Sequence, residues 1–183
     1  MAAYARPDAD ITTTGVGGGT YASIDETSAN DADFIYGNEN AAVTYECSLT
    51  NVSDPASAAD HTVRYRVAKL NGTSLDGDGA AVYATVSLYE GASLIAADTR
   101  RTCDGSWTTY ELDLSEAQAN SITDYTALRI RLVSPASGGS ASSRRAVGLS
   151  GAEFECPNAT VTGAVTLSGT GTAAGAAKLT VFG

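Results

Sequence analysis

The sequence has few of the residues on which most catalytic, metal-binding and disulfide-rich proteins depend. Its 183 residues include one histidine, one tryptophan, one methionine, three phenylalanines and three cysteines. An odd number of widely spaced cysteines matches neither a disulfide framework nor a zinc site. Cys47 and Cys156 fall at apolar positions of predicted strands, and we interpret them as small buried hydrophobic residues. A bridge between them is an alternative that requires the two strands to be neighbours.

Positive charge and long apolar runs are also scarce. Eleven basic residues stand against 21 acidic ones, which gives a formal net charge of -10. An acidic protein repels phosphate groups, so we expect no nucleic-acid partner. No apolar run approaches the roughly 20 residues that span a bilayer, so we expect no membrane partner. The first residues, MAAYARPDADITTTG, lack the basic and apolar segments of a secretory signal.

No catalytic constellation is visible. The single histidine, His61, begins a predicted strand, and we interpret it as a structural residue at the surface or edge of the fold. The run GVGGG lacks the lysine and hydroxyl residue of a phosphate-binding loop. We therefore expect that the chain is not an enzyme and has no cofactor. Calcium is the one metal with candidate ligands, but none matches the twelve-residue calcium loop with its distal glutamate, and we interpret these acids as solvated turn residues. These candidate ligands are Asp8, Asp10, Asp31, Asp33, Asp76 and Asp78.

Alternating apolar and polar residues form the dominant pattern that is present. Such alternation is typical of strands with one face in a core, and the intervening segments are rich in Gly, Ser, Asp and Asn. We predict an all-β antiparallel β-sandwich, a jelly roll of about eight to ten strands, over residues 1–157. The predicted strands lie within residues 41–49, 61–70, 81–90, 94–100, 107–114, 127–133 and 146–156.

Local signals refine this prediction. The sequence EGAS at 90–93 predicts a hairpin turn, and Ser115 with Gln118 forms a capping-box pattern that predicts a short helix. The apolar parity shifts within 148–151, which predicts a β-bulge. Trp107 begins a strand without a second aromatic beside it, so we interpret it as a packing residue at the rim of the sandwich.

The composition changes at Pro157. Residues 158–183 carry one charged residue, Lys178, and are otherwise rich in Gly, Ala, Thr and Val. This composition predicts a C-terminal extended β arm that adds strands to its own sandwich or to a neighbouring subunit. The apolar residues expected to make these contacts are Val161, Val165, Leu167, Leu179, Val181 and Phe182.

Several strand motifs in a fixed order carry a family resemblance. They are RPDADITTTG, YASIDETSANDADFI, HTVRYRVAK, VSLYEGASLIA, SWTTYELDLS, ITDYTALRIRL and RRAVGLSGAEFE. In this order they resemble a jelly-roll domain of tailed-bacteriophage structural proteins, over about residues 6–157. More distantly, SWTTYELDL resembles carbohydrate-binding and galactose-binding-like sandwiches. The residues in these motifs are packing residues, so the resemblance implies a fold and a place in a virion but no chemistry.

The resemblance implies a virion component that assembles in the cytoplasm of a bacterial host. We expect a capsid decoration or cement protein that attaches to the head lattice and stabilises it. Its expected partners are the major capsid protein and copies of itself, as a homotrimer. The alternative is a carbohydrate-binding module for host adsorption at the tail tip or on a fibre. In that case the outward tyrosines Tyr83 and Tyr89 would face surface glycans.

Overall fold

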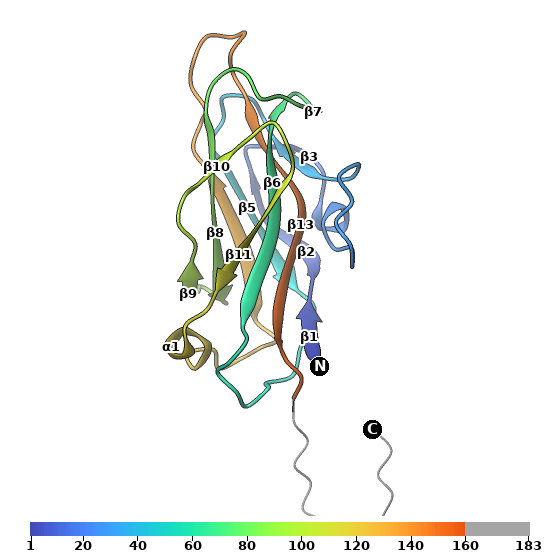
Figure 1. Ribbon diagram of the computed structural model, residues 1–183, viewed down its shortest axis with the longest axis vertical. Coiled ribbons are helices and arrows are strands. Elements are labelled where there is room, and N and C mark those ends of the chain that lie inside the picture. The colour runs from blue at the N-terminus through green and yellow to red at the C-terminus, as the bar shows by residue number, and fades with distance from the viewer. Residues whose placement is uncertain (160–183) are drawn as a thin grey trace, which may run out of the picture.

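Two antiparallel β-sheets lie face to face in the computed structural model, which describes residues 1–159 (Figure 1). The first sheet contains β1 (Ala2–Ala5), β3 (Val16–Gly18), β4 (Ile35–Gly37), β6 (Thr62–Asn71), β7 (Ser74–Leu75), β11 (Thr108–Asp113) and β13 (Ala146–Pro157). The second contains β2 (Pro7–Thr14), β5 (Val43–Leu49), β8 (Val82–Glu90), β9 (Ser93–Ala97), β10 (Arg101–Cys103) and β12 (Leu128–Ser134). The described chain also forms a 3-10 turn, η1 (Tyr21–Ser23), and one short helix, α1 (Glu116–Ala119).

The strand order confirms the predicted antiparallel β-sandwich. The first sheet runs β11-β6-β13-β4-β3, with β1 beside β13 and β7 beside β6. The second runs β10-β8-β12-β5-β2, with β9 beside β8. Along the chain, successive long strands therefore alternate between the two sheets, as is usual in jelly rolls. These strands are β5, β6, β8, β11, β12 and β13. The short strands β9 and β10, which follow β8, stay in the same sheet as β8. No helix among residues 1–159 is long and apolar enough to cross a membrane.

The core lies between the sheets because alternate residues of each strand point inward. In β8, residues 82, 84, 86 and 88 are buried and those between them are partly exposed. The largest fully buried side chains come from both sheets and include Tyr45, Tyr65, Leu88, Ile130 and Phe154. Each buried side chain of this size contributes about 1.5–3 kcal/mol of hydrophobic free energy. This shared core holds the outer faces of the two sheets in fixed positions.

The apolar pattern does not predict the two N-terminal strands. The sequence of β2, PDADITTT, has one buried residue and no alternation. Strand β2 nevertheless pairs with β5 at the edge of the second sheet, and its register shifts twice. Polar composition and bulges are common in edge strands because both discourage pairing with another chain.

The local signals are confirmed. The turn between β8 and β9 places Gly91 at φ 56°, where glycine is favoured. At α1, the Ser115 hydroxyl accepts a hydrogen bond from the Gln118 amide, and the Gln118 side chain accepts one from the Ser115 amide. The register between β13 and β6 shifts between Leu149 and Gly151, as a β-bulge requires. Sequence-local interactions decide the turn and the helix cap, whereas the sequence predicts the bulge because the apolar parity of the strand changes there.

Trp107 packs within the fold directly before β11. Its ring lies 5.3 Å from the ring of Phe34, and a side chain at Gly148 would place its Cβ 2.8 Å from the Trp107 ring. Gly148 therefore leaves the room that the indole fills. The half-buried position of Trp107 supports the predicted packing role.

The two ends of the described chain lie together at one pole of the sandwich (Figure 1). Strand β1 pairs with the end of β13, with Ala2 opposite Pro157. The Asn158 amide donates a hydrogen bond of 3.1 Å to the Met1 carbonyl. The arm residues Val161, Val165, Leu167, Leu179, Val181 and Phe182 lie outside the described residues.

The three cysteines are free thiols inside the sandwich. Cys47 and Cys156 are 0% exposed and Cys103 is 2% exposed. The alternative of a Cys47–Cys156 bridge is therefore not realised. Burial raises the pKa of Cys47 and of Cys103 to about 12, and that of Cys156 to about 11. Burial and a high pKa both suppress thiol reactivity, because the thiolate is the reactive form.

We expect the folded chain to react slowly with dithionitrobenzoate at about pH 8.5, the ordinary pKa of a free thiol. Three thiols per chain should react at once when the protein is unfolded in urea. The measurement is the absorbance of the released thiolate with and without urea. Rapid stoichiometric labelling of the folded protein would contradict the burial of these side chains.

Candidate functional site

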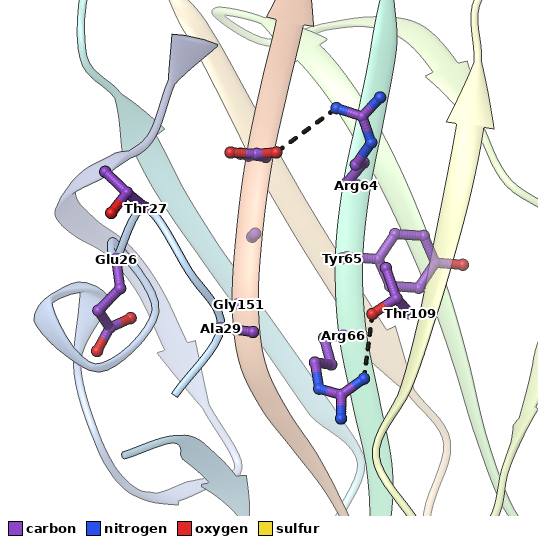
Figure 2. Close-up of a pocket in the computed structure, with 10 residues that line it drawn as sticks. Glu26, Thr27, Ala29, Arg64, Tyr65, Arg66, Thr109 and Gly151 are labelled. Atoms are coloured by element: carbon purple, nitrogen blue, oxygen red, sulfur yellow. Dashed lines mark hydrogen bonds and ion pairs between the residues drawn. The ribbon is translucent and has the colours of Figure 1, made fainter. Parts of the chain in front are cut away.

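A hollow of about 110 Å³ lies on the outer face of the first sheet (Figure 2). One wall is the segment that follows η1, and the floor and opposite wall come from β13, β6 and β11. We call residues 26–31 of that wall the covering segment. The hollow is lined by Glu26, Thr27, Ala29, Arg64, Tyr65, Arg66, Thr109, Gly151, Ala152 and Glu153.

The pairing of β13 with β6 determines which side chains line this hollow. Gly151 lies opposite Arg66, and Glu153 lies opposite Arg64. The bulge at 149–151 sets the parity of β13 so that Glu153 points to the same outer face as the two arginines. Gly151 lies beside Ala29 of the covering segment, since a Cβ at Gly151 would make an ordinary contact of 3.8 Å with the Ala29 Cβ. The hollow therefore lies next to the β-bulge of β13.

Arg64 stands at the centre of a network of ion pairs on one side of the hollow. Its Nε lies 2.8 Å from Glu111, and its Nη1 contacts Glu155 and lies 3.5 Å from Glu153. Glu153 also pairs with Arg6 at 3.0 Å. Hydrogen bonds to Glu155 and then to Glu111 raise the pKa of the Arg64 guanidinium above its ordinary value. Arg64 is therefore held by carboxylates from both neighbouring strands.

Arg66 ties the covering segment to the sheet. Its Nε and Nη2 donate to the two carboxylate oxygens of Asp31 at 2.7 and 2.8 Å, and its Nη1 donates to the Thr109 hydroxyl at 3.1 Å. The Ser150 hydroxyl donates to Asp31 at 3.0 Å. The hydrogen bonds from Arg66 hold the pKa of Asp31 below its usual value. Paired hydrogen bonds of this kind fix geometry as well as charge.

Glu26 differs from the other acids around the hollow. Its Oε2 is buried and has no hydrogen-bond partner among the described residues. Figure 2 shows Glu26 on the covering segment, on the other side of β13 from Arg64 and Arg66. A buried polar atom without a partner costs about 1–3 kcal/mol, and more when the group is charged. The buried Oε2 of Glu26 is therefore not accessible from the open hollow, although the residue lines it.

The predicted glycan-facing residues lie on the other sheet. Tyr83 and Tyr89 both point outward from β8 and are half-buried. They are six positions apart, which is about 20 Å along a strand. The Arg100 guanidinium covers the Tyr83 ring at 4.2 Å, and Arg131 covers the Tyr89 ring at 4.0 Å. The structure therefore does not bring the two rings together into one platform, and their contact with glycans stays a prediction.

The sequence analysis did not identify a buried carboxylate on the outer face of the second sheet, the face that carries Tyr83 and Tyr89. Glu46 is 2% exposed although it points to the outside of β5. Arg129 and Arg131, at alternate positions of the neighbouring strand β12, contact its two oxygens at 3.3 and 2.5 Å. The Arg-Ile-Arg pattern of β12 is the sequence signal that two arginines share the outer face. Only the register between β12 and β5 places Arg131 opposite Glu46. The two arginines neutralise Glu46, so we interpret this cluster as structural.

His61 is buried, which corrects the expected position at the surface or edge. It is 1% exposed, and its ring nitrogens lie 2.8 Å from the Ala59 carbonyl and 2.8 Å from the Tyr125 hydroxyl. Its ring also packs 5.8 Å from that of Phe154. Both nitrogens are engaged inside the core, so the histidine has a structural environment.

The candidate calcium ligands do not gather into a site. Asp8 and Asp10 lie on β2, not on a loop as expected. Asp10 accepts hydrogen bonds from the Tyr21 amide and the Tyr45 hydroxyl, both at 2.8 Å. Asp76 pairs with Arg145 at 2.9 Å. Within residues 1–159, no group of three or more His, Cys, Asp or Glu side chains could hold a metal ion.

No protein-family profile matches the sequence, and no curated protein matches it. Several solved structures align with most of the length of this chain. An arabinose-bound GH51 α-L-arabinofuranosidase is 11% identical, with a TM-score of 0.41 over 81% of this chain and 25% of that protein. A Stig cyclase from Fischerella sp. TAU is 18% identical, with a TM-score of 0.43 over 87% of this chain and 75% of that one. A second cyclase from Fischerella sp. TAU is 17% identical, with a TM-score of 0.42.

These matches correct the expectation that the chain is not an enzyme. The structures that align with the chain are described as a glycosidase and as cyclases, so the exclusion of enzymatic activity is not kept. The identities are below 25%, however, and this chain spans a quarter of the arabinofuranosidase. With TM-scores below 0.5 as well, the matches assign no activity to this chain.

The Asp31–Arg66 pair predicts a pH-dependent contribution to stability. Because the pKa of Asp31 is lowered in the folded state, its contribution is complete above the unfolded pKa of about 3.9 and is lost as the pH falls through the folded value. We expect Asp31→Asn to reduce the free energy of unfolding at neutral pH by about 1 kcal/mol or less, since the pair is partly exposed. The difference from the parent should shrink in acid.

Urea unfolding at neutral and at acidic pH measures this effect. Asp33→Asn, on the same exposed stretch of chain, is the matched control for the loss of one negative charge. An equal destabilisation by both variants, or one that grows in acid, would show that the ion pair is not its source.

Proposed function

We propose that the chain is a structural component of a tailed-phage virion, a capsid decoration protein that attaches to the head lattice. Its sandwich would be displayed on the particle, and residues 158–183 would attach it to the major capsid protein and to copies of itself in a trimer. The order of strand motifs that resembles phage jelly-roll modules supports this proposal. Assembly would take place in the cytoplasm of the bacterial host.

The polar surface of the sandwich is the observation that carries the proposal. Apart from Met1, its large exposed apolar side chains each lie on a different strand of the described chain, so no single strand presents a row of them. They are Tyr4, Ile11, Leu75, Leu94 and Val133. Stable association normally needs a contiguous apolar contact. The surface of the sandwich therefore favours a domain displayed on the particle over a domain that binds the capsid lattice through its own strands.

In this proposal, the segment after Pro157 supplies the apolar contact that the surface of the sandwich does not offer. The segment after Pro157 continues from the pole where β1 and β13 pair, and Lys178 is its only charged residue. Each apolar side chain buried at a subunit junction contributes about 1.5–3 kcal/mol, while ordering the backbone costs about 1–2 kcal/mol per residue. Because these terms nearly balance, attachment would need strand pairing as well as side-chain burial.

Truncation after Pro157 should abolish attachment to decoration-free capsids and leave the sandwich folded. A second variant keeps the length of the segment and replaces Leu167, Leu179 and Phe182 with serine. The copy number per capsid, measured by quantitative mass spectrometry, should fall to background for both variants. The melting temperature of the unattached protein checks the fold. Full occupancy by the truncated chain would rule out the role of this segment.

A second candidate is glycan binding during host adsorption, at a tail tip or on a fibre. The outward, half-buried side chains of Tyr83 and Tyr89 favour it. Because the two rings are far apart, Tyr83→Ala and Tyr89→Ala should weaken binding on a glycan array independently, and the double variant should lose the product of the two factors. Val133→Ala on the same face is the control. A parent protein that binds no surface polysaccharide would count against this candidate.

A further inference from the structure

We propose that Asn71 is a site of spontaneous deamidation, at which the chain gains one negative charge as the protein ages. Asn71 and Gly72 form the only Asn-Gly pair in the sequence. The pair lies at the turn between β6 and β7, at the pole of the sandwich opposite the ends of the described chain (Figure 1). This inference goes beyond the proposed attachment to a capsid and does not depend on it.

The reaction joins two groups that this pair places next to each other. The backbone nitrogen of Gly72 attacks Cγ of Asn71 and loses its proton, a cyclic imide forms, and the side-chain nitrogen Nδ2 leaves as ammonia. Water then opens the ring at either of its carbonyls and leaves an aspartate or an isoaspartate. Glycine is the successor that most favours ring closure, because it has no Cβ to hinder the attack and adopts conformations that other residues avoid.

The turn leaves the reacting groups open to solvent. Asn71 is exposed, and so are both residues of β7, Ser74 and Leu75. Gly72 has φ 60°, and no atom beyond its chain neighbours lies within 4 Å of the position that a Cβ would take there. Ring closure requires the Asn71 side chain and the backbone to rotate. An exposed strand of 2 residues can open locally at little cost, so the folded protein allows this rotation.

Two hydrogen bonds hold the turn and oppose the reaction until they open. The Gly72 amide donates to Oε1 of Glu39 at 2.8 Å, and Nδ2 of Asn71 donates to Oδ2 of Asp76 at 3.1 Å. Both are exposed to water, which can replace either partner, so they slow the reaction without preventing it. Loss of the Gly72 amide proton beside the Glu39 carboxylate is also electrostatically unfavourable. Glu39 therefore protects Asn71.

The modification changes the surroundings of Asp76. This carboxylate also accepts a hydrogen bond from the Asp78 amide at 2.7 Å and pairs with Nη2 of Arg145 at 2.9 Å. Arg145 is buried, and its guanidinium donates to two carbonyls of the segment that precedes β13. Deamidation replaces the Asn71 donor by a second carboxylate, which Asp76 repels. The product therefore loses one of the contacts that order this pole of the sandwich.

Peptide mapping by mass spectrometry tests the proposal on the folded full chain, before and after incubation for weeks at neutral pH. Digestion at acidic pH avoids deamidation during the preparation. Asn51 is the internal control, because it is also exposed but precedes Val52, whose branched side chain hinders ring closure. Asn71→Gln is the matched variant, since it keeps the amide on a longer side chain that would have to close a larger ring. Asn71→Asp supplies the charge of the product.

We expect a gain in mass on the peptide that contains residues 71 and 72, and an acidic species that elutes with Asn71→Asp in anion-exchange chromatography. Asn71 should react about tenfold faster than Asn51 or more, because glycine places no side chain beside the attacking nitrogen. Glu39→Ala should accelerate the reaction. Asn71→Gln should remove the acidic species.

Three results would overturn the proposal. They are an Asn71 that stays intact in the folded chain while it reacts in urea, equal rates at Asn71 and Asn51, and an acidic species that persists in Asn71→Gln. The melting temperature of each variant shows that it is folded during the incubation.

Discussion

The antiparallel pairing of β6 with β13 is the interaction on which the rest of the structure depends. It joins residues near the middle of the chain to the last described strand, and Phe154 and Val63 from this pair reach the centre of the core. The same register places Glu153 beside Arg64 and Gly151 beside Arg66 on the outer face. A single pairing thus determines both the packing inside the sandwich and the polar hollow outside it. The bulge within β13 reconciles the two, because it lets both ends of a 12-residue strand keep their apolar residues inward.

Charge on the outer faces is largely neutralised within the protein. Arg64 and Arg66 each hold carboxylates from neighbouring segments, and on the opposite sheet Arg129 and Arg131 enclose Glu46. These groups have their partners already, so they organise the surface and do not wait for a ligand. Four buried side-chain atoms of the described residues remain without a hydrogen-bond partner, namely Nε of Arg6, Arg144 and Arg145 and Oε2 of Glu26.

The two proposals concern different parts of the chain. Attachment to a lattice would use the uncharged segment after Pro157, which follows from the pole where the described chain ends. Deamidation would change the turn between β6 and β7, at the opposite pole (Figure 1). Ageing of a displayed sandwich would therefore leave the attachment pole unchanged. The fold alone assigns no function, because β-sandwiches support many functions through their surface residues.

The sequence by itself determined the features that depend on near neighbours. Alternation along residues 82–90 and 128–134 predicted the strands and their inward faces, and Ser115 with Gln118 predicted the helix cap. It did not reveal β2, whose exposed edge position requires no apolar alternation. Tertiary structure alone decided that Tyr83 and Tyr89 stand apart, that His61 is buried, and that Asp31 of the covering segment pairs with Arg66. The physical reason is that periodicity reports which side of a strand is apolar, whereas burial and contact depend on which distant strand lies beside it and in what register.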